Sequence, residues 1–571
     1  MEIWRVNLRT GSLQRGPVPE AWDRLGGRGL LARILLDEVP PACEPLGPSN
    51  RLVFAPGLLV GHMLSSCDRI SIGAKSPMTR GIKEANAGGT TGLQMACLGI
   101  RALILEDLVP SPSHVRTDWR VLHLGPEGAR LDPAGDLAGL GVFAAAERLR
   151  ARYGDQVAIS LIGPGGEMRL VAAGIQNLDK ERVPSRIAAR GGLGAVMGAK
   201  GLKAVVFDAA GGSRPPLADP EAFQAARKLF TRNVLEHPQS GLYRDYGTAA
   251  MGAMTNAMGA LPTRAFASGQ FEAVDAISGE RLREVMLARG GDGTPTHACM
   301  PGCAIRCSNN YAGADGRSLV TPLEYETIGL MGSNLGLSDL DQIARLNWEV
   351  NDLGLDAIDL GAALGVAAQA GLLAFGDGDR ALALLREIRQ GTPLGLVLGH
   401  GAAVAGKVLG VIRVPVVKGQ AMSAYEPRAI KGTGVTFATS PQGADHTAGN
   451  TVRAQVDHLD PKLQAALSRT AQINMAGYDT LGACIFAGSG FSVAPEVIPG
   501  LLNARYGWEV GLDILQLLGR ETLRLEREFN RRAGFTAVDD RMPEWMTLEP
   551  LPPNNAVFDV PDADLDGVFD W

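Results

Sequence analysis

Three cysteines within nine residues are the most chemically distinctive feature of the chain. Cys299, Cys303 and Cys307 lie in the segment Cys-Met-Pro-Gly-Cys-Ala-Ile-Arg-Cys. Clustered thiolates bind zinc or an iron–sulfur cluster, and an odd total of seven cysteines argues against a disulfide framework. Three sulfurs need a fourth ligand, which either kind of site must recruit from elsewhere in the chain.

Two residues are candidates for that fourth ligand. His297 stands two positions before the first cysteine and would complete a zinc site, whereas Cys484 is a distant cysteine of the kind that completes many iron–sulfur clusters. We favour the iron–sulfur interpretation; a purely structural group of cysteines is the third alternative. The solitary Cys43, Cys67 and Cys97 are expected to be small core residues.

Two short segments share the form Asx-x-Leu-Gly-x-(Asp/Cys). They are residues 351–356, Asn-Asp-Leu-Gly-Leu-Asp, and residues 479–484, Asp-Thr-Leu-Gly-Ala-Cys. Glycine lets the backbone turn and approach a ligand closely, and a carboxylate accepts hydrogen bonds from ring N–H and amino groups. The pattern suits a heterocycle rich in donors, held between two helix ends. The alternative is two unrelated helices that each end at a glycine.

The elements that position these segments change character along the chain. Residues 1–208 alternate short strand-like runs with Gly and Pro, which predicts a sheet-rich region. After the linker-like residues 209–216 the apolar spacing becomes helical. We predict one helix over residues 339–353, with Ser338 as its N-cap, and another over residues 461–475.

Length and composition exclude several classes of protein. The chain has 571 residues, enough for about three or four domains of roughly 150 residues each. Its hydrophobic share of 46% excludes bulk disorder, and its net charge of −6 argues against a nucleic-acid partner. Residues 360–376 and 391–406 are apolar but too short to span a bilayer, so we expect buried helices there.

The two ends of the chain carry further expectations. The first residues form an alternating, strand-like start without the pattern of a signal peptide, so we expect a cytoplasmic protein with no membrane partner. Residues 550–571 are acidic and rich in proline, which predicts a tail that wraps the surface or is partly disordered.

Taken together, these segments resemble the tungsten-dependent aldehyde ferredoxin oxidoreductase family over most of the chain. In that family two pterins hold tungsten, a Cys-x2-Cys-x3-Cys segment and a distant cysteine bind a four-iron cluster, and two Asp-x-x-Gly-Leu-(Asp/Cys) loops hold the pterins. Further family-like segments are residues 25–33, 75–79, 86–89, 189–200, 259–264, 322–326, 425–428 and 443–446.

The resemblance implies an α+β multidomain fold. A sheet-rich domain over residues 1–208 would form the base for a bis-pterin cofactor, followed by two mainly α-helical domains. The first, residues 209–415, would carry the cluster loop and the first pterin loop. The second, residues 416–571, would carry the second pterin loop and the distant cysteine.

The resemblance also implies the cofactor ligands. One 4Fe-4S cluster would be bound by Cys299, Cys303, Cys307 and Cys484. The pterins and their phosphates, bridged in some members by magnesium, would be bound by Arg69, Asn86, Gly88, Arg186, Arg190, Gly191, Asn351, Gly354, Leu355, Asp356, Asp479, Gly482, Cys484 and Ile485. Arginine forks suit phosphate oxygens, and consecutive glycines expose N–H groups to an anion. The metal is left open between tungsten and molybdenum.

Two departures from the family pattern affect these implied sites. The first cysteine gap is three residues rather than two, so the cluster is either intact with a changed loop, which we favour, or altered or lost. Asn351 stands where the family has Asp, which removes a charge but keeps a carbonyl acceptor. The chain also lacks Glu-x-x-His, the motif for a subunit-bridging iron, so a homodimer would be held in another way.

Three residues are candidates for proton chemistry. Glu324, Glu326 and His446 lie in family-like segments, and the family has a Glu and a His near the metal. A carboxylate can remove a proton and an imidazole can polarise a carbonyl near neutral pH. We prefer Glu326 over Glu324 and interpret Asp445 as a capping carboxylate. Without the resemblance, we would interpret each glutamate as a solvated strand charge and His446 as an N-cap residue or a core histidine.

The implied function is oxidation of a small-molecule aldehyde to the carboxylic acid. Electrons would pass through the cluster to ferredoxin or an iron–sulfur partner subunit. One alternative is a low-potential reductase of the same superfamily, acting on an aromatic thioester or a carboxylic acid. The other is a non-catalytic iron–sulfur or zinc-binding protein on the same fold.

Overall fold

Two six-stranded sheets form the first 207 residues of the chain. The computed structural model describes residues 1–111 and 116–571. The first sheet has the order β2-β1-β6-β3-β4-β5. Its strands are β1 (Glu2–Asn7), β2 (Ser12–Pro17), β3 (Leu52–Pro56), β4 (Ile70–Lys75), β5 (Ile82–Ala87) and β6 (Ile100–Glu106). β1 pairs with β6 in parallel and the other neighbours pair antiparallel. β3 and β4 are buried throughout, and β3 is accordingly apolar along its whole length.

The second sheet has the order β11-β10-β9-β12-β7-β8. Its strands are β7 (Arg120–Gly125), β8 (Gly128–Pro133), β9 (Ala158–Leu161), β10 (Ile175–Leu178), β11 (Pro184–Ala188) and β12 (Leu202–Phe207). Both sheets contribute to one apolar core, in which the rings of Phe54 and Phe207 lie 6.0 Å apart. The connecting helices are α1 (Gly27–Glu38), α2 (Thr91–Cys97), α3 (Val142–Tyr153), α4 (Pro164–Glu167) and α5 (Leu193–Ala199).

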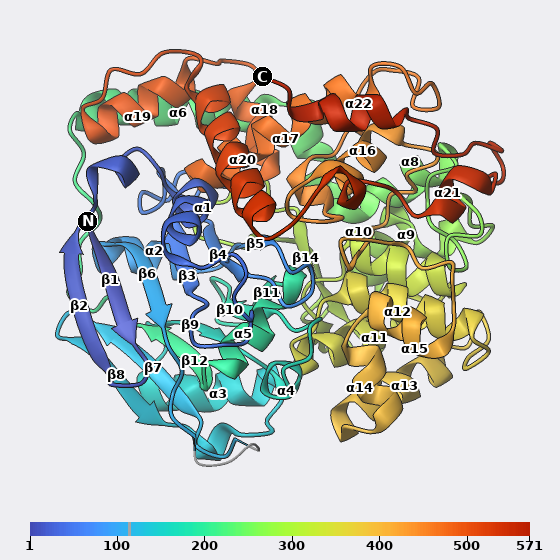
Figure 1. Cartoon of the computed structure of the whole chain (residues 1–571), viewed down its shortest axis with the longest axis horizontal. Coiled ribbons are helices and arrows are strands. Elements are labelled where there is room, and N and C mark those ends of the chain that lie inside the picture. The colour runs from blue at the N-terminus through green and yellow to red at the C-terminus, as the bar shows by residue number, and fades with distance from the viewer. Residues whose placement is uncertain (112–115) are drawn as a thin grey trace.

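The remainder of the chain is mainly helical. Figure 1 shows these helices beside the sheets, with α11–α15 on the right and α17, α20 and α22 above. The helices up to residue 409 are α6 (Pro220–Glu236), α7 (Pro238–Tyr246), α8 (Met251–Ala257), α9 (Gly279–Arg289), α10 (Tyr325–Thr327), α11 (Leu340–Leu353), α12 (Ala357–Gln369), α13 (Gly378–Gln390), α14 (Pro393–Gly399) and α15 (Ala402–Leu409). The later helices are α16 (Lys431–Thr439), α17 (Gln464–Leu481), α18 (Gly488–Phe491), α19 (Val497–Tyr506), α20 (Ile514–Arg532), α21 (Glu544–Leu548) and α22 (Asp562–Asp566). Short strands interrupt them: β13 (Thr294–His297), β14 (Ser308–Ala312), β15 (Ser318–Val320), β16 (Val416–Val417) and β17 (Gln420–Ala421).

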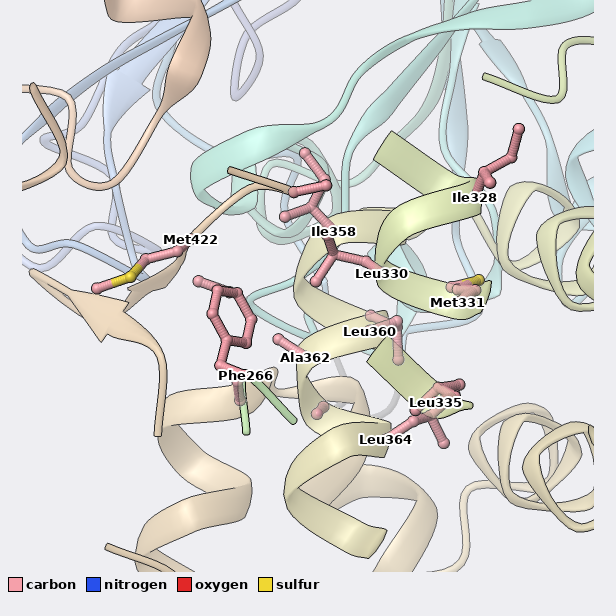
Figure 2. Close-up of a cluster of buried hydrophobic side chains, with 14 of the residues drawn as sticks. Phe266, Ile328, Leu330, Met331, Leu335, Ile358, Leu360, Ala362, Leu364 and Met422 are labelled. Atoms are coloured by element: carbon pink, nitrogen blue, oxygen red, sulfur yellow. The ribbon is translucent and has the colours of Figure 1, made fainter. Parts of the chain in front are cut away.

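A π-helical turn over Ile328–Gly332 anchors the first helical region. Figure 2 shows its Leu330 against Ile358 and Leu360 of α12. The two backbones approach closely because position 361 is glycine, where a Cβ would lie 2.7 Å from the Cβ of Leu330. Helix α12 therefore fixes the segment that follows α10.

The helix ends differ in detail from the sequence prediction. Helix α11 is capped by Asp339, whose carboxylate accepts a hydrogen bond from the Asp341 N–H at 2.8 Å, and not by Ser338. Asp339 takes the role because its side chain lies directly before the first helical residue. Helix α17 begins later and ends later than the predicted residues 461–475.

The C-terminal tail is ordered and packs on the helical core. Its Leu551, Phe558, Leu565 and Val568 are buried, so the prediction that it wraps the surface holds and the alternative of partial disorder is wrong. The predicted class, a sheet-rich region followed by helical domains, is confirmed. Among the described residues, no single helix is long and apolar enough to cross a membrane. The short helical stretches Ile485–Val493 and Val497–Tyr506 reach that length only together, with a bend of 101° between them.

Candidate active site and cysteine cluster

Four cysteines from two distant segments lie together. Cys299, Cys303 and Cys307 lie in the loop between β13 and β14, and Cys484 follows the end of α17. Ser66 links the two segments: its carbonyl accepts the Cys484 N–H at 2.7 Å and its Oγ lies 3.4 Å from the Cys303 Sγ. Burial raises the pKa of the Cys307 thiol, and the nearby Cys484 and Cys303 raise it further. The four thiols therefore lie close enough to act on one another electrostatically.

The longer first gap of the cysteine loop closes against the first domain. Gly302 lies in this gap with φ +77°, and a Cβ there would lie 2.6 Å from the Met63 carbonyl oxygen. Gly88 lies under the first cysteine, where a Cβ would be 3.3 Å from the Cys299 Sγ. The Gly89 N–H donates to the Cys299 carbonyl at 3.1 Å. Glycines at these positions let the cysteine loop pack closely on the first domain.

His297 has carboxylate partners. Its Nε2 lies 3.0 Å from Oδ2 of Asp179 and 3.3 Å from Oε2 of Glu181, both in the turn between β10 and β11. Asp179 is buried and also accepts a hydrogen bond from the Ser185 hydroxyl at 2.8 Å. In this structure His297 Nε2 therefore faces carboxylates; its ligand atom and those of Asp179 and Glu181 lie within 4.8 Å of one another.

The two echoing segments share one backbone geometry. Gly354 ends α11 with φ +72° and Gly482 ends α17 with φ +79°, both in the left-handed region that favours glycine. Both glycines are also crowded: a Cβ on Gly354 would lie 2.7 Å from the Gly163 nitrogen, and one on Gly482 would lie 2.6 Å from Cγ2 of Val60. Both helix ends therefore press closely on the first domain.

Arg190 ties the first of these loops to the segment that carries His446. Its Nε donates to Oδ2 of Asp356 at 3.2 Å, and its other nitrogens donate to the carbonyls of Ala444, at 2.6 Å, and Ala421. Asp356 also caps α12 by accepting the Ile358 N–H at 2.9 Å. These contacts hold the Arg190 guanidinium and the Asp356 carboxylate in one orientation.

A buried lysine completes this side of the site. Lys83 donates to Oδ2 of Asp445 at 2.7 Å, and Gly191 makes room for it, because a Cβ there would lie 2.3 Å from the Lys83 Cγ. Although burial opposes it, Lys83 and Arg190 hold the pKa of Asp445 below its usual range. Asp445 also accepts the Thr447 N–H at 3.0 Å. It is a capping carboxylate, as the sequence predicts.

Arg69 contacts the loop that follows α17, as Arg190 contacts the loop that follows α11. Its Nε donates to Oδ1 of Asn86, and its backbone N–H donates to the Gly482 carbonyl at 3.1 Å. Asp479 accepts a hydrogen bond from Arg28 at 3.2 Å. Burial raises the pKa of Asp479 well above its usual value, and the Glu84 carboxylate adds to the shift.

Other predicted ligands lie further from these contacts. Asn351 donates to Asn347 at 3.2 Å within its own helix, and Leu355 is fully buried in the helical core. Ile485 is 42% exposed. Arg186 donates to the Ser308 hydroxyl at 2.8 Å, on the edge of the cysteine loop.

Glu326, in α10, and His446, in the segment that follows α16, face each other. Oε1 of Glu326 lies 3.3 Å from Nε2 of His446, and its Oε2 accepts the Ala424 N–H at 2.8 Å. Oε1 of Glu326 and Nδ1 of His446 are buried, and neither has a hydrogen-bond partner in the part of the chain that the structure describes. Burial raises the pKa of Glu326, and His446 partly offsets this. The pair therefore retains hydrogen-bonding capacity for a ligand.

Glu324 lies elsewhere. Its Oε1 is 3.7 Å from Arg186 and accepts a hydrogen bond from the Ser308 hydroxyl at 3.4 Å. Its charge acts on Cys307, so it borders the cysteine loop. The two glutamates are separated because α10 begins at Tyr325, between them.

Two family models together match nearly the whole chain. The model for the aldehyde ferredoxin oxidoreductase N-terminal domain matches residues 3–209, and the model for domains 2 and 3 matches residues 225–569. The chain belongs to the aldehyde ferredoxin oxidoreductase family. It is thus an oxidoreductase, and the family resemblance predicted from its motifs is confirmed.

Individual relatives agree with this assignment. The chain is 30% identical to the tungsten-containing aldehyde ferredoxin oxidoreductase of Pyrococcus horikoshii, over 96% of this chain and 92% of that protein. It is 27% identical to the aliphatic sulfonate oxidoreductase WOR-like subunit of Pyrococcus furiosus, over 86% and 80% of the two chains. The active-site complex BamBC of benzoyl coenzyme A reductase has a similar fold, with a TM-score of 0.80 at 20% identity, covering 100% of this chain and 93% of that one.

Several buried residues that hold the site were not among those predicted from the family motifs. Lys83 supports Asp445, and Arg28 connects Asp479 with Glu526, donating to the latter at 2.7 and 2.9 Å. For Lys83 the available signal was the Lys-Glu pair within the buried strand β5, since charges in a buried strand need partners.

Proposed function

We propose that the chain oxidises an aldehyde to a carboxylic acid at a tungsten bis-pterin centre and passes the electrons through a 4Fe-4S cluster to ferredoxin or an iron–sulfur subunit. The position of Cys484 carries the proposal. It belongs both to the second Gly-terminated loop and to the group of four cysteines. One short segment would therefore contact both cofactors.

The residues fit both groups. Arg69, Arg190 and the glycines around them offer donors to pterin phosphates, together with a magnesium ion that would bridge those phosphates. Asp356 and Asp479 offer carboxylate acceptors to ring N–H groups. The four sulfurs fit a four-iron cluster. We infer that the metal is tungsten rather than molybdenum, because similar proteins are tungsten-containing aldehyde ferredoxin oxidoreductases.

The reaction consumes one water for each aldehyde: RCHO + H2O gives RCOO⁻, three protons and two electrons. When bound, the tungsten centre supplies the two-electron acceptor, and two one-electron carriers then remove the electrons. The carboxylate of Glu326 takes a proton from the attacking water at Oε1, the buried oxygen that faces His446. The imidazole of His446 donates a hydrogen bond to the aldehyde oxygen and polarises the carbonyl.

Burial favours this division of roles. A raised pKa makes the Glu326 carboxylate a stronger base than an exposed glutamate. The backbone N–H of Ala424 fixes its other oxygen, so the reactive oxygen has one orientation. Tyr425 packs beside the pair, with its ring 5.7 Å from that of His446, and helps to exclude bulk water.

The test is aldehyde oxidation by the anaerobically purified protein. We expect reduction of a viologen dye when an aldehyde is added, and an approximately stoichiometric yield of acid. A protein that retains its metals but oxidises no aldehyde would contradict the proposal. Reduction of a thioester or a carboxylic acid, without aldehyde oxidation, would favour the reductase alternative. The similarity to the benzoyl coenzyme A reductase complex concerns the fold alone.

A further inference from the structure

Arg453 has no acidic partner although it is half-buried. It lies seven residues after His446, and its guanidinium stacks over the ring of Tyr243 at 4.6 Å. One of its nitrogens donates to the Met251 sulfur at 3.3 Å. In the part of the chain that the structure describes, no carboxylate oxygen lies within 4.0 Å of this guanidinium. Both Tyr243 and Met251 are buried, so the side chain is directed inwards.

The guanidinium lies in the neighbourhood of the candidate catalytic pair. The ring of Tyr425 is 5.7 Å from His446 and 5.3 Å from Tyr325. Burial and the Glu326 carboxylate raise the pKa of Tyr425, and the charge of Arg453 acts on the same phenol in the opposite direction. The Tyr325 hydroxyl also donates to the Thr255 hydroxyl at 2.9 Å, and Thr255 lies one turn along α8 from the Met251 that Arg453 contacts.

An unpaired guanidinium in such a place is physically unusual. Partial burial removes hydration from a cation, and protein arginines normally recover it from a carboxylate. A guanidinium carries five N–H donors, and here one thioether sulfur and one aromatic face are its recorded partners. Its planar fork matches the paired oxygens of a carboxylate or a sulfonate.

We propose that Arg453 binds an anionic group at the end of the substrate remote from the aldehyde. This inference rests on the proposed function and narrows the substrate to aldehydes that carry a carboxylate or a sulfonate. The stacking on Tyr243 holds the guanidinium in place before the substrate arrives, which reduces the entropy lost on binding. Arg453 is thus a specificity residue and takes no part in proton transfer.

The experiment compares matched aldehydes of increasing length. Each ω-formyl carboxylate and each ω-formyl sulfonate is paired with the straight-chain alkanal that has the same number of methylene groups. The length at which the charged aldehyde is most favoured then gives the span between Arg453 and the reacting carbon. The measured quantity is the ratio of kcat/KM for the charged aldehyde to that for the neutral one. We expect the wild type to prefer one charged series by about tenfold to hundredfold, the usual range for a hydrogen bond to a charged group. The carboxylate and sulfonate arms identify which anion fits.

Variants locate the source of that preference. Arg453→Gln should abolish the ratio mainly through KM, and Arg453→Lys should restore part of it. Arg15→Gln is the matched control, since Arg15 also stacks on an aromatic ring, that of Trp4 at 4.1 Å, but in the first domain. An equal loss for charged and neutral aldehydes in Arg453→Gln, or a wild type without preference at any length, would overturn the inference. Absence of oxidation with every aldehyde would instead overturn the proposed function.

Discussion

Oε1 of Glu326 lies 3.3 Å from Nε2 of His446, while the Glu324 carboxylate, two residues earlier in the chain, faces Arg186. The two glutamates are therefore a matched pair for mutation. Glu326→Gln removes the proposed base, and we expect kcat to fall by about 10²- to 10⁴-fold, the usual contribution of general acid–base catalysis. Tungsten and iron contents should stay at wild-type values. Glu324→Gln should have a much smaller effect on kcat, and a larger loss in this variant would contradict the assignment.

The pH dependence of kcat/KM should report the environment of Glu326. A base acts in its deprotonated form, so activity is lost as the pH falls through its pKa. Burial raises the pKa of Glu326, which moves this acidic limb above the ordinary range of glutamate, about 4.3. His446 lowers the pKa of Glu326, so His446→Gln should move the limb to still higher pH in the residual activity. A limb that stays in place in this variant would speak against the contact.

Cysteine variants should separate cluster ligands from core cysteines. Cys484→Ser is expected to lose the iron, because Cys484 lies with the three cysteines of the loop. Cys67→Ser is the matched control: Cys67 is fully buried near the same group but belongs to the apolar core. Iron analysis and electron paramagnetic resonance of the reduced protein measure both. Equal iron loss in the two variants would show that packing alone, and not ligation, explains the effect.

Gly482 should tolerate alanine less well than a glycine of the same backbone conformation elsewhere. Gly482 and Gly410 have φ values of +79° and +70°, but only at Gly482 would a Cβ meet another atom within 4 Å. Gly410→Ala should therefore cost only the left-handed conformation, about 1–2 kcal/mol. Gly482→Ala should lower the thermal midpoint further and reduce the tungsten content. Indistinguishable midpoints at one scan rate would contradict the close packing of this helix end.

Local features of the fold were predictable from the sequence, but long-range contacts of the site were not. The end of α11 at Gly354 follows from helical spacing and one glycine, both of which are local signals. Arg190 and Asp356 are 166 residues apart, and Arg28 and Glu526 are 498 apart. No periodic pattern relates such positions, because their contact depends on how whole elements pack.

The choice between the two glutamates shows the same limit. Glu324 and Glu326 are two residues apart in one motif, and the motif alone does not distinguish their roles. The start of α10 between them directs one towards the cysteine loop and the other towards His446. The π-helical turn next to this motif packs on α12, whose residues lie far along the chain from the motif.

Elemental analysis of the anaerobically purified native protein tests the central claim most directly. The proposed cofactors predict one tungsten and about four irons per chain, with the cysteine loop binding its cluster despite the longer first gap. Tungsten without iron would contradict the proposed cluster and its electron path. Zinc alone, with neither tungsten nor molybdenum, would contradict the redox function and leave a metal-binding protein on this fold.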